Sequence, residues 1–523
     1  MRNAMLAMGV QLWVLPALLV WPVFAAGVVR LLGRDVSRED SGAEAPSGGP
    51  DARWLTLGAL IVESIFGLLL FAVFEPAKKG WQARFDLPWL ADLGAAVSLG
   101  VDGLSMPLVV ITVVLLPVTL LGAWNNVRAR TPAFGALILL LTSGLVGVFI
   151  ALDLLVFYLA WELMLIPTYL LVGVWSTAGR SRAALRYVLF TLVGSLLMLV
   201  AIITLWNLSG ANSFGWDHLA LQTLTPRTQL FLALAFLSAF AVKSALVPFH
   251  TWLPDAQEAA PTFAAVTIGF KVGAYGILRF VLPFFPAGLA WDPLRNTLLV
   301  LAIIGILYGA LVALAQRDLK RVISYSSISH LGFIMLGVMA FSPQGAQGAA
   351  MSIVNSSLTT CALFLLAGML EDRTGSTELS QFGGIAQRAP FFAMALTVAM
   401  LATIGLPGTS GFVAEWLVLF GAFLSKPTHT LIATAGVVFA AAYGLRAVQM
   451  LLYGAAGART DAMSDCTGRE RLALAVVLSL IVVLGIAPAP VLRPLALGTN
   501  SVIESLQFGP NAPYASPSMS VNR

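Results

Sequence analysis

Residues 396–423 read LTVAMLATIGLPGTSGFVAEWLVLFGAF, and residues 232–254 read LALAFLSAFAVKSALVPFHTWLP. Both stretches are apolar enough to cross a bilayer, which takes about 20 residues of helix. Each also has a proline inside it, Pro407 in the first and Pro248 in the second. Proline removes an amide donor and clashes with the preceding turn, so each helix should break there. We therefore predict two interrupted transmembrane helices.

The composition of the whole chain agrees with a membrane protein. Its 523 residues are 59% hydrophobic and only 11% charged, whereas soluble domains carry roughly 25% charged residues. So few charges cannot cover the surfaces of the roughly three soluble domains that this length would otherwise form. We exclude a soluble cytosolic enzyme, a disordered chain and a nucleic-acid-binding protein.

The sequence carries no recognisable cofactor or metal motif. Cys361 and Cys466 are too few for a four-cysteine iron–sulfur or zinc site, and we expect both to be unpaired. No HExxH or GxSxG motif occurs, and we predict no strand that a nucleotide-binding glycine pattern could follow. His218 and His429 fall in or beside loops, which argues against a haem held by two helices.

About fourteen segments are predicted to span the membrane, and no soluble domain is left over. The first begins near Ala7 and is longer than a signal-peptide core of about 7–15 residues, so we interpret it as a transmembrane helix. The polar stretch 33–53 is rich in Ser, Gly and Pro and is predicted to be a mobile linker. The segments cover residues 7–32, 54–74, 104–124, 132–153, 154–176, 184–207, 228–250, 263–283, 295–316, 321–341, 347–370, 389–424, 430–453 and 470–493.

Positive charges predict the orientation. Most arginines and lysines fall in the loops after odd-numbered segments, among them Arg34 and Arg130, and far fewer fall in the loops after even-numbered ones. By the positive-inside rule the odd-numbered loops are cytoplasmic, and both termini lie on the outer side.

The two interrupted segments lie five segments apart, which suggests an internal repeat. Segments 4–8 and 9–13 can form two five-helix units, and because five is odd the second unit would be inverted. Paired interrupted helices in an inverted repeat indicate an ion pathway, although Pro and Gly are also common in ordinary membrane helices. We predict an all-α polytopic fold with N-terminal helices in 1–131, repeats in 132–283 and 284–453, and a C-terminal helix and tail in 454–523.

A few ionisable residues lie inside these segments, where charge is costly and such side chains usually face a polar interior. Burial disfavours a charged form and a nearby opposite charge restores it, so moving one charge can load or unload a proton on its neighbour. A permease for a neutral solute would not need this arrangement, so we interpret it as a proton pathway. The residues are Glu63, which is isolated and left outside the pathway, and Glu162, Lys243, Lys271, His330 and Glu415.

Four of the five pathway residues also have a structural alternative. Glu162 could form a packing ion pair, and Lys243 or Lys271 could extend to the membrane interface. His330 could be hydrogen-bonded packing, although the hydroxyl-rich run before it could hold water. The long apolar flanks of Glu162, Lys243 and Glu415 favour function, whereas the two readings of Lys271 and of His330 are balanced.

Several segments resemble a known family. GVDGLSMPLVVIT (100–112), FYLAWELMLIPTYLLVGVW (157–175), KVGAYGILRFVLPFFP (271–286) and AQRDLKRVISYSSISHLGF (315–333) are similar to the proton-conducting antiporter-like subunits of bacterial NADH-quinone oxidoreductase, or respiratory complex I. The resemblance implies fourteen helices with two inverted repeats, in the bacterial inner membrane. It implies a proton-pump module whose partners are other membrane-arm subunits, including other antiporter-like ones. It also implies no cofactor in this chain, with FMN, iron–sulfur clusters and quinone in partner subunits.

The resemblance also assigns roles to the buried residues. Glu162 would be the acid paired with Lys243, Lys271 and His330 would form a central relay, and Glu415 would be the terminal site toward the outside.

The chain departs from the family pattern in several places. Asn355 and Gln257 stand where histidines are expected, the stretch from Thr262 to Lys271 is about one helical turn short, and the linker after Arg34 is long. These differences could mark a member whose complex uses another electron donor. A subunit of a sodium/proton antiporter, or of a related hydrogenase or photosynthetic complex, is the alternative function. A purely structural scaffold is a third, against which the buried charges argue.

Overall fold

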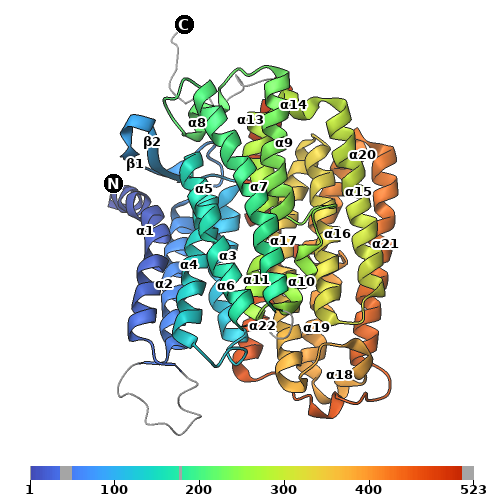
Figure 1. Ribbon diagram of the computed structural model, residues 1–523. Helices are drawn as coiled ribbons and strands as arrows, with labels where there is room; N and C mark the ends of the chain where they lie inside the picture. The colour runs from blue at the N-terminus through green and yellow to red at the C-terminus, as the bar shows by residue number, and fades with distance from the viewer. Residues whose placement is uncertain (1, 36–49, 176–179, 509–523) are drawn as a thin grey trace.

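The computed structural model describes residues 2–35, 50–175 and 180–508. It is a bundle of long helices with a small β-hairpin at one end, and segments from all parts of the sequence lie side by side (Figure 1). The N-terminal part contains α1 (Arg2–Leu32), α2 (Ala52–Val73), β1 (Gln82–Leu90), β2 (Ala95–Val101) and α3 (Ser105–Gly122).

The middle of the chain has the largest number of short helices. It contains α4 (Thr131–Ile150), α5 (Leu154–Leu163), α6 (Leu165–Trp175), α7 (Arg180–Leu208), α8 (Trp216–Ala220), α9 (Pro226–Lys243), α10 (Trp252–Ala259), α11 (Thr262–Ile268), α12 (Val272–Gly276), the π-helix η3 (Ile277–Val281), α13 (Leu282–Phe284) and α14 (Pro286–Ala290).

The C-terminal part consists mainly of long helices. It contains α15 (Asp292–Ala315), α16 (Leu319–Met339), α17 (Pro343–Thr374), α18 (Ile385–Arg388), α19 (Pro390–Thr403), α20 (Ser410–Ser425), α21 (Pro427–Leu452), α22 (Gly468–Ile486) and α23 (Ala489–Phe508).

The predicted membrane character is confirmed. In the described part of the chain, 11 helical stretches are long and apolar enough to cross a membrane, or 12 if α22 and α23, which meet at 68°, form one span. Every predicted segment coincides with one or more helices, and segment 263–283 with the four short elements α11, α12, η3 and α13. The total of fourteen spans and the repeat symmetry remain predictions. α16 and α17 lie in the core, whereas α7, α15 and α21 present exposed apolar side chains outward, as expected for contact with lipid.

Both predicted interruptions are present. Eight residues, among them Pro248, separate the end of α9 from the start of α10. Six residues, among them Pro407, separate the end of α19 from the start of α20. A proline has no amide to continue the helical ladder, so the backbone leaves the helix ahead of it.

Two further spans are interrupted, although the sequence predicted them as continuous. α5 and α6 are separated at Met164, because Pro167 leaves the carbonyl of Leu163, four residues earlier, without a helical donor. The second interruption runs from Gly269 to Lys271, between α11 and α12. Most of the predicted pathway residues lie close to these interruptions, so the interruptions position the candidate site.

The prediction that the chain has no strands is wrong. β1 and β2 pair antiparallel, with Phe85 opposite Leu99 and Leu87 opposite Val97. Gly94 ends the short turn between them at φ +67°, a conformation that glycine adopts without strain. The strands were missed because they are short and lie in a stretch between two long apolar runs, where helical periodicity gives no signal.

Two other predicted features are only partly described. The linker prediction falls mostly on residues 36–49, which lie outside the described residues, as does Arg38 among the odd-loop arginines. The chain after residue 494 was expected to be a polar tail, but it continues as helix α23 to Phe508. The remainder, residues 509–523, also lies outside the described part.

Candidate functional site

Glu162 lies in the last turn of α5, beside the interruption at Met164. Its side chain is half-buried, and its Oε1 atom is buried without a hydrogen-bond partner among the described residues. Tyr158, one turn earlier on α5, contacts both Glu162 and Ser195 of α7. A buried carboxylate oxygen without a donor is costly, so the role of Glu162 as the acid of the pathway stays a prediction.

Lys243 is the last residue of α9, at the edge of the gap that contains Pro248. Its ammonium donates a hydrogen bond to the hydroxyl of Tyr187 at 2.8 Å. The same nitrogen lies 5.1 Å from the ring centroid of Tyr187 and 5.7 Å from that of Trp161. An aromatic face attracts a cation without supplying a countercharge. The Trp161 ring and the Tyr187 hydroxyl therefore hold this lysine, which forms no ion pair with an acid among the described residues.

Glu162 and Lys243, which the resemblance pairs, do not form an ion pair among the described residues. Trp161 is the residue next to Glu162, and its ring faces the lysine. The pairing therefore stays a prediction.

Lys271 lies at the interruption between α11 and α12 and is fully buried. Close packing explains the glycines around it: a Cβ on Gly273 would meet the Phe240 carbonyl oxygen of α9 at 2.5 Å, and one on Gly269 would meet Thr360 of α17 at 2.3 Å. A small cavity of about 20 Å³ joins this interruption to Lys243, large enough for about one water molecule. Its lining includes Tyr187, Lys243, Thr168, Thr267, Phe270 and Val272.

His330 of α16 and Glu415 of α20 face each other directly. The Nδ1 atom of His330 lies 3.6 Å from Oε1 of Glu415, and both residues are buried. The link from this pair to Lys271, which the resemblance implies, stays a prediction. The Nε2 atom of His330 has no hydrogen-bond partner among the described residues, which leaves it available to a water molecule.

Gly405 makes room for the carboxylate of Glu415 in the gap between α19 and α20. Its φ of +73° favours glycine, and a Cβ there would lie 2.5 Å from Oε2 of Glu415. The broken helix therefore does two things: it places an irregular backbone at the site, and it provides the space that the acid occupies.

The two positions that depart from the family pattern have defined contacts. The Oδ1 atom of Asn355 accepts a hydrogen bond from Ser410, the first residue of α20, at 2.7 Å. Gln257 donates to the carbonyl of Ala265 at 3.2 Å, and its Oε1 is buried without a partner among the described residues. Neither amide can titrate, so each can only orient its neighbours.

The sequence analysis overlooked a buried ion pair. Arg279, inside η3, donates to both carboxylate oxygens of Asp102 at 2.5 and 2.8 Å, and both side chains are almost fully buried. Arg279 lies inside a predicted segment and Asp102 in the motif GVDG, so both were visible as intramembrane or near-membrane charges. Glu63, set aside as peripheral, is instead 1% exposed, and both its oxygens lack hydrogen-bond partners among the described residues.

A metal site is not formed by the described residues, where no group of three His, Cys, Asp or Glu side chains could hold an ion. Cys361 and Cys466 are buried and are not bonded to each other. The geometry supports relay of protons between carboxyl, ammonium and imidazole groups through small amounts of water.

Several known proteins are similar to this chain in sequence and in fold. The family described as NADH:quinone oxidoreductase/Mrp antiporter, transmembrane, matches residues 151–441. NADH-quinone oxidoreductase subunit M of Rhodobacter capsulatus is 37% identical over 483 residues, which cover 90% of this chain and 92% of the relative. F420H2 dehydrogenase subunit M of Methanosarcina mazei is 34% identical and covers 87% of this chain and 93% of its own length.

A solved structure agrees in fold along nearly the whole chain. A chain of respiratory complex I from Thermus thermophilus with bound NADH has a TM-score of 0.83 and 33% identity to this protein. The alignment covers 94% of this chain and 99% of that one. This chain therefore belongs to the NADH:quinone oxidoreductase/Mrp antiporter transmembrane family, alongside the M subunits of the oxidoreductases.

Proposed function

We propose that this chain is a proton-translocating subunit of a quinone-reducing complex in the bacterial inner membrane and carries no redox centre itself. FMN, iron–sulfur clusters and quinone would belong to other subunits. Relatives named for both NADH and F420H2 oxidation match over most of their length, so this subunit's architecture is compatible with more than one electron donor.

The observation that carries the proposal is the position of the ionisable groups beside interruptions of the helices. Glu162 lies beside one, Lys243 and Lys271 lie at two others, and Glu415 occupies the space over Gly405 in a fourth. Interrupted helices free backbone groups that can hold water or ions deep in a membrane protein. Ordinary packing would not require titratable side chains at these points.

We infer an order of transfer with which the contacts are consistent. A proton leaving or reaching Glu162 would change the charge near Trp161 and Lys243, and Lys243 communicates with the interruption at Lys271 through the small cavity. From Lys271, charge would pass to His330 and from there to Glu415, whose Oε1 atom lies 3.6 Å from Nδ1 of His330. We assign Glu415 as the terminal group toward the outside, and 132–283 and 284–453 as the two inverted repeats.

The test uses the whole complex in inverted membrane vesicles, with proton uptake and NADH oxidation measured separately. Glu162→Gln keeps the shape of the side chain and removes its proton, so uptake per NADH oxidised should fall about tenfold or more. Lys243→Ala should act similarly. Glu63→Gln is the matched control, because Glu63 is also buried in a span but lies outside the series.

Three results would contradict the proposal. Normal proton uptake in the Glu162→Gln complex would remove the role of that residue. A complex that fails to assemble in the Lys243→Ala variant, but pumps normally when assembly is restored, would support packing alone. Uptake that requires sodium and continues without electron transfer would favour the antiporter alternative.

A further inference from the structure

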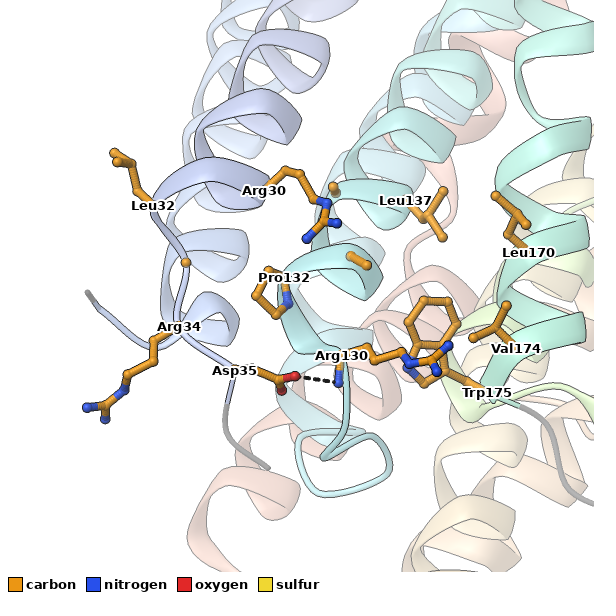
Figure 2. Close-up of a pocket in the computed structure, with 13 residues that line it drawn as sticks. Arg30, Leu32, Arg34, Asp35, Arg130, Pro132, Leu137, Leu170, Val174 and Trp175 are labelled. Carbon is orange, nitrogen blue, oxygen red and sulfur yellow. Dashed lines mark hydrogen bonds between the residues drawn. The ribbon is translucent and has the colours of Figure 1, made fainter. Parts of the chain in front are cut away.

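A large pocket lies away from the buried series, at the end of the bundle where α1 and α6 finish and α4 begins. Its volume is about 830 Å³, within the range of about 300–1,000 Å³ that is usual for small-molecule sites. The pocket opens outward between three membrane helices (Figure 2). By the distribution of positive charge, this is the cytoplasmic end of the molecule.

Two arginines supply the charge of the pocket. Figure 2 shows that the side chains of Arg30, from α1, and Arg130, from the turn before α4, extend toward the same space, whereas Arg34 points away from it. Among the ion pairs formed by described residues, none includes Arg30 or Arg130. Asp35 is engaged differently, because its carboxylate accepts hydrogen bonds from the backbone amides of Arg130 and Thr131 at 3.0 and 3.2 Å.

The opposite wall of the pocket is apolar. Leu137 of α4 and Leu170 and Val174 of α6 line it (Figure 2). Trp175 closes the wall, and its indole nitrogen donates to the carbonyl of Ala129 at 2.8 Å, which fixes the ring. A tryptophan with one polar edge and one apolar face is typical of the border between membrane and water.

The surface beside the pocket is also apolar and open. Leu31, Leu32 and Ile166 are 83%, 61% and 64% exposed. Such exposure on spanning helices fits acyl chains, whereas a free anion would make no use of an apolar wall. Arg30 and Arg130 form no ion pair among the described residues, and they lie beside an apolar surface. This combination matches one chemical class, a lipid with an anionic headgroup.

We propose that this pocket binds an anionic phospholipid, with its phosphate between Arg30 and Arg130 and an acyl chain along Leu137, Leu170 and Val174. Guanidinium groups bind phosphate through paired, charge-assisted hydrogen bonds. Basic pockets between membrane helices are suited to such headgroups on the side where anionic lipids are plentiful. The bound lipid would join α1 to α4 and α6 at this end of the bundle.

The test places the complete complex in nanodiscs made from phosphatidylcholine with a minor share of phosphatidylglycerol that carries a photoreactive acyl chain. After illumination, labelled peptides of this subunit are counted by mass spectrometry. We expect label within residues 133–137 and 170–175 of the intact protein. Replacing either Arg30 or Arg130 by Gln should reduce the amount of label about fivefold, and replacing both should multiply the two effects.

Two control variants distinguish binding in the pocket from attraction of the anionic lipid to any positively charged surface. Arg128→Gln with Arg182→Gln removes the same charge from exposed residues of the same end that do not line the pocket, and should leave the label unchanged. Leu170→Asn keeps both pocket arginines but weakens the acyl contact, so it should lower labelling by the lipid while leaving competition by inorganic phosphate unaltered.

Three outcomes would overturn the proposal. Equal loss of label in the pocket and control variants would mean nonspecific attraction to an anionic surface. Displacement of the lipid by millimolar inorganic phosphate, with no effect of Leu170→Asn, would mean a site for free phosphate. Label absent from these peptides, with a neighbouring subunit cross-linked there instead, would mean a protein interface.

Discussion

The segments 132–283 and 284–453 hold their buried charges in different ways. In the first, the Lys243 ammonium contacts the hydroxyl of Tyr187 and the ring of Trp161, and it forms no ion pair with an acid within the described part of the chain. In the second, His330 and Glu415 face each other at 3.6 Å over a glycine. The difference follows from the sign of the charge, because the face of an aromatic ring is electronegative. Such a face stabilises a cation but not a carboxylate, which needs a cationic partner or a proton.

The two segments are also anchored differently to the rest of the chain. The first is tied to the N-terminal part by Arg279 and Asp102, whose side chains are only 2% and 3% exposed. The second is tied to α22 by Arg373 and Glu470, which are each 11% exposed and whose pair includes the cap of that helix. Removing one partner of a fully buried pair leaves a charge with no water around it, so the first anchor should be the more sensitive.

The largest effect is expected at the buried anchor. Asp102→Leu should destabilise the subunit by about 3–5 kcal/mol, because Arg279 is left charged and buried. The thermal unfolding midpoint of the purified complex, with the amount of assembled subunit, measures this. The double variant Asp102→Leu with Arg279→Met should recover much of the loss. A single variant as stable as the unaltered protein would contradict the argument.

The next effect tests the space around the acid in the second segment. Gly405→Ala should cost about 2 kcal/mol from its left-handed backbone and should also displace the Glu415 carboxylate. Gly408→Ala is the matched control, since its φ is +92° but nothing lies within 4 Å of its Cβ position. Proton uptake per NADH oxidised should therefore fall much further in the Gly405 variant. Equal uptake in both would mean that the glycine serves only the backbone.

A smaller effect is expected for the aromatic shell in the first segment. Tyr187→Phe keeps the ring and removes the hydrogen bond to Lys243, which should cost about 1.5 kcal/mol at this half-buried site. Tyr187→Leu removes both, so its loss of proton uptake should be larger. Proton uptake is measured in vesicles that carry each variant, and the two values are compared. If they are equally impaired, the ring contributes nothing to holding the cation.

The smallest effect is expected at the second anchor. Glu470→Gln weakens the contact with Arg373 and part of the helix cap, and should cost about 1 kcal/mol. Because this pair is closer to solvent than Asp102 and Arg279, added salt should shrink the difference in unfolding midpoint from the unaltered protein. A salt-independent loss as large as that of Asp102→Leu would erase the contrast between the two anchors.

Much of the architecture could be read from particular residues. Pro248 and Pro407 predicted two interrupted helices, and both are present. The interruptions at Met164 and at Lys271 were missed, because each depends on how neighbouring helices pack as well as on the local sequence. Pro167 was a readable signal for the first. For the second, the signal was the glycines around Lys271, but their reason is the close approach of α9 and α17, which the sequence alone does not show.

Some candidate site residues could also be identified from the sequence, whereas others could not. Composition isolated Glu162, Lys243, Lys271, His330 and Glu415, because a charge inside an apolar segment is conspicuous in a chain that has so few. Arg279 was equally conspicuous and was overlooked. Its partner Asp102 is 177 residues away, and only the fold brings the two together.

The sequence by itself determined that this chain lies in a membrane and where two of its four interrupted spans break, and it singled out buried groups as candidate proton carriers. Those properties depend on hydrophobicity, on proline geometry and on the cost of burying charge, which are all local. The tertiary structure decided which groups touch: Lys243 with Tyr187 rather than an acid, and His330 with Glu415. It also gathered Arg30 and Arg130 at one pocket. Contacts between distant segments depend on the packing of whole helices, and a single position in the sequence does not specify that.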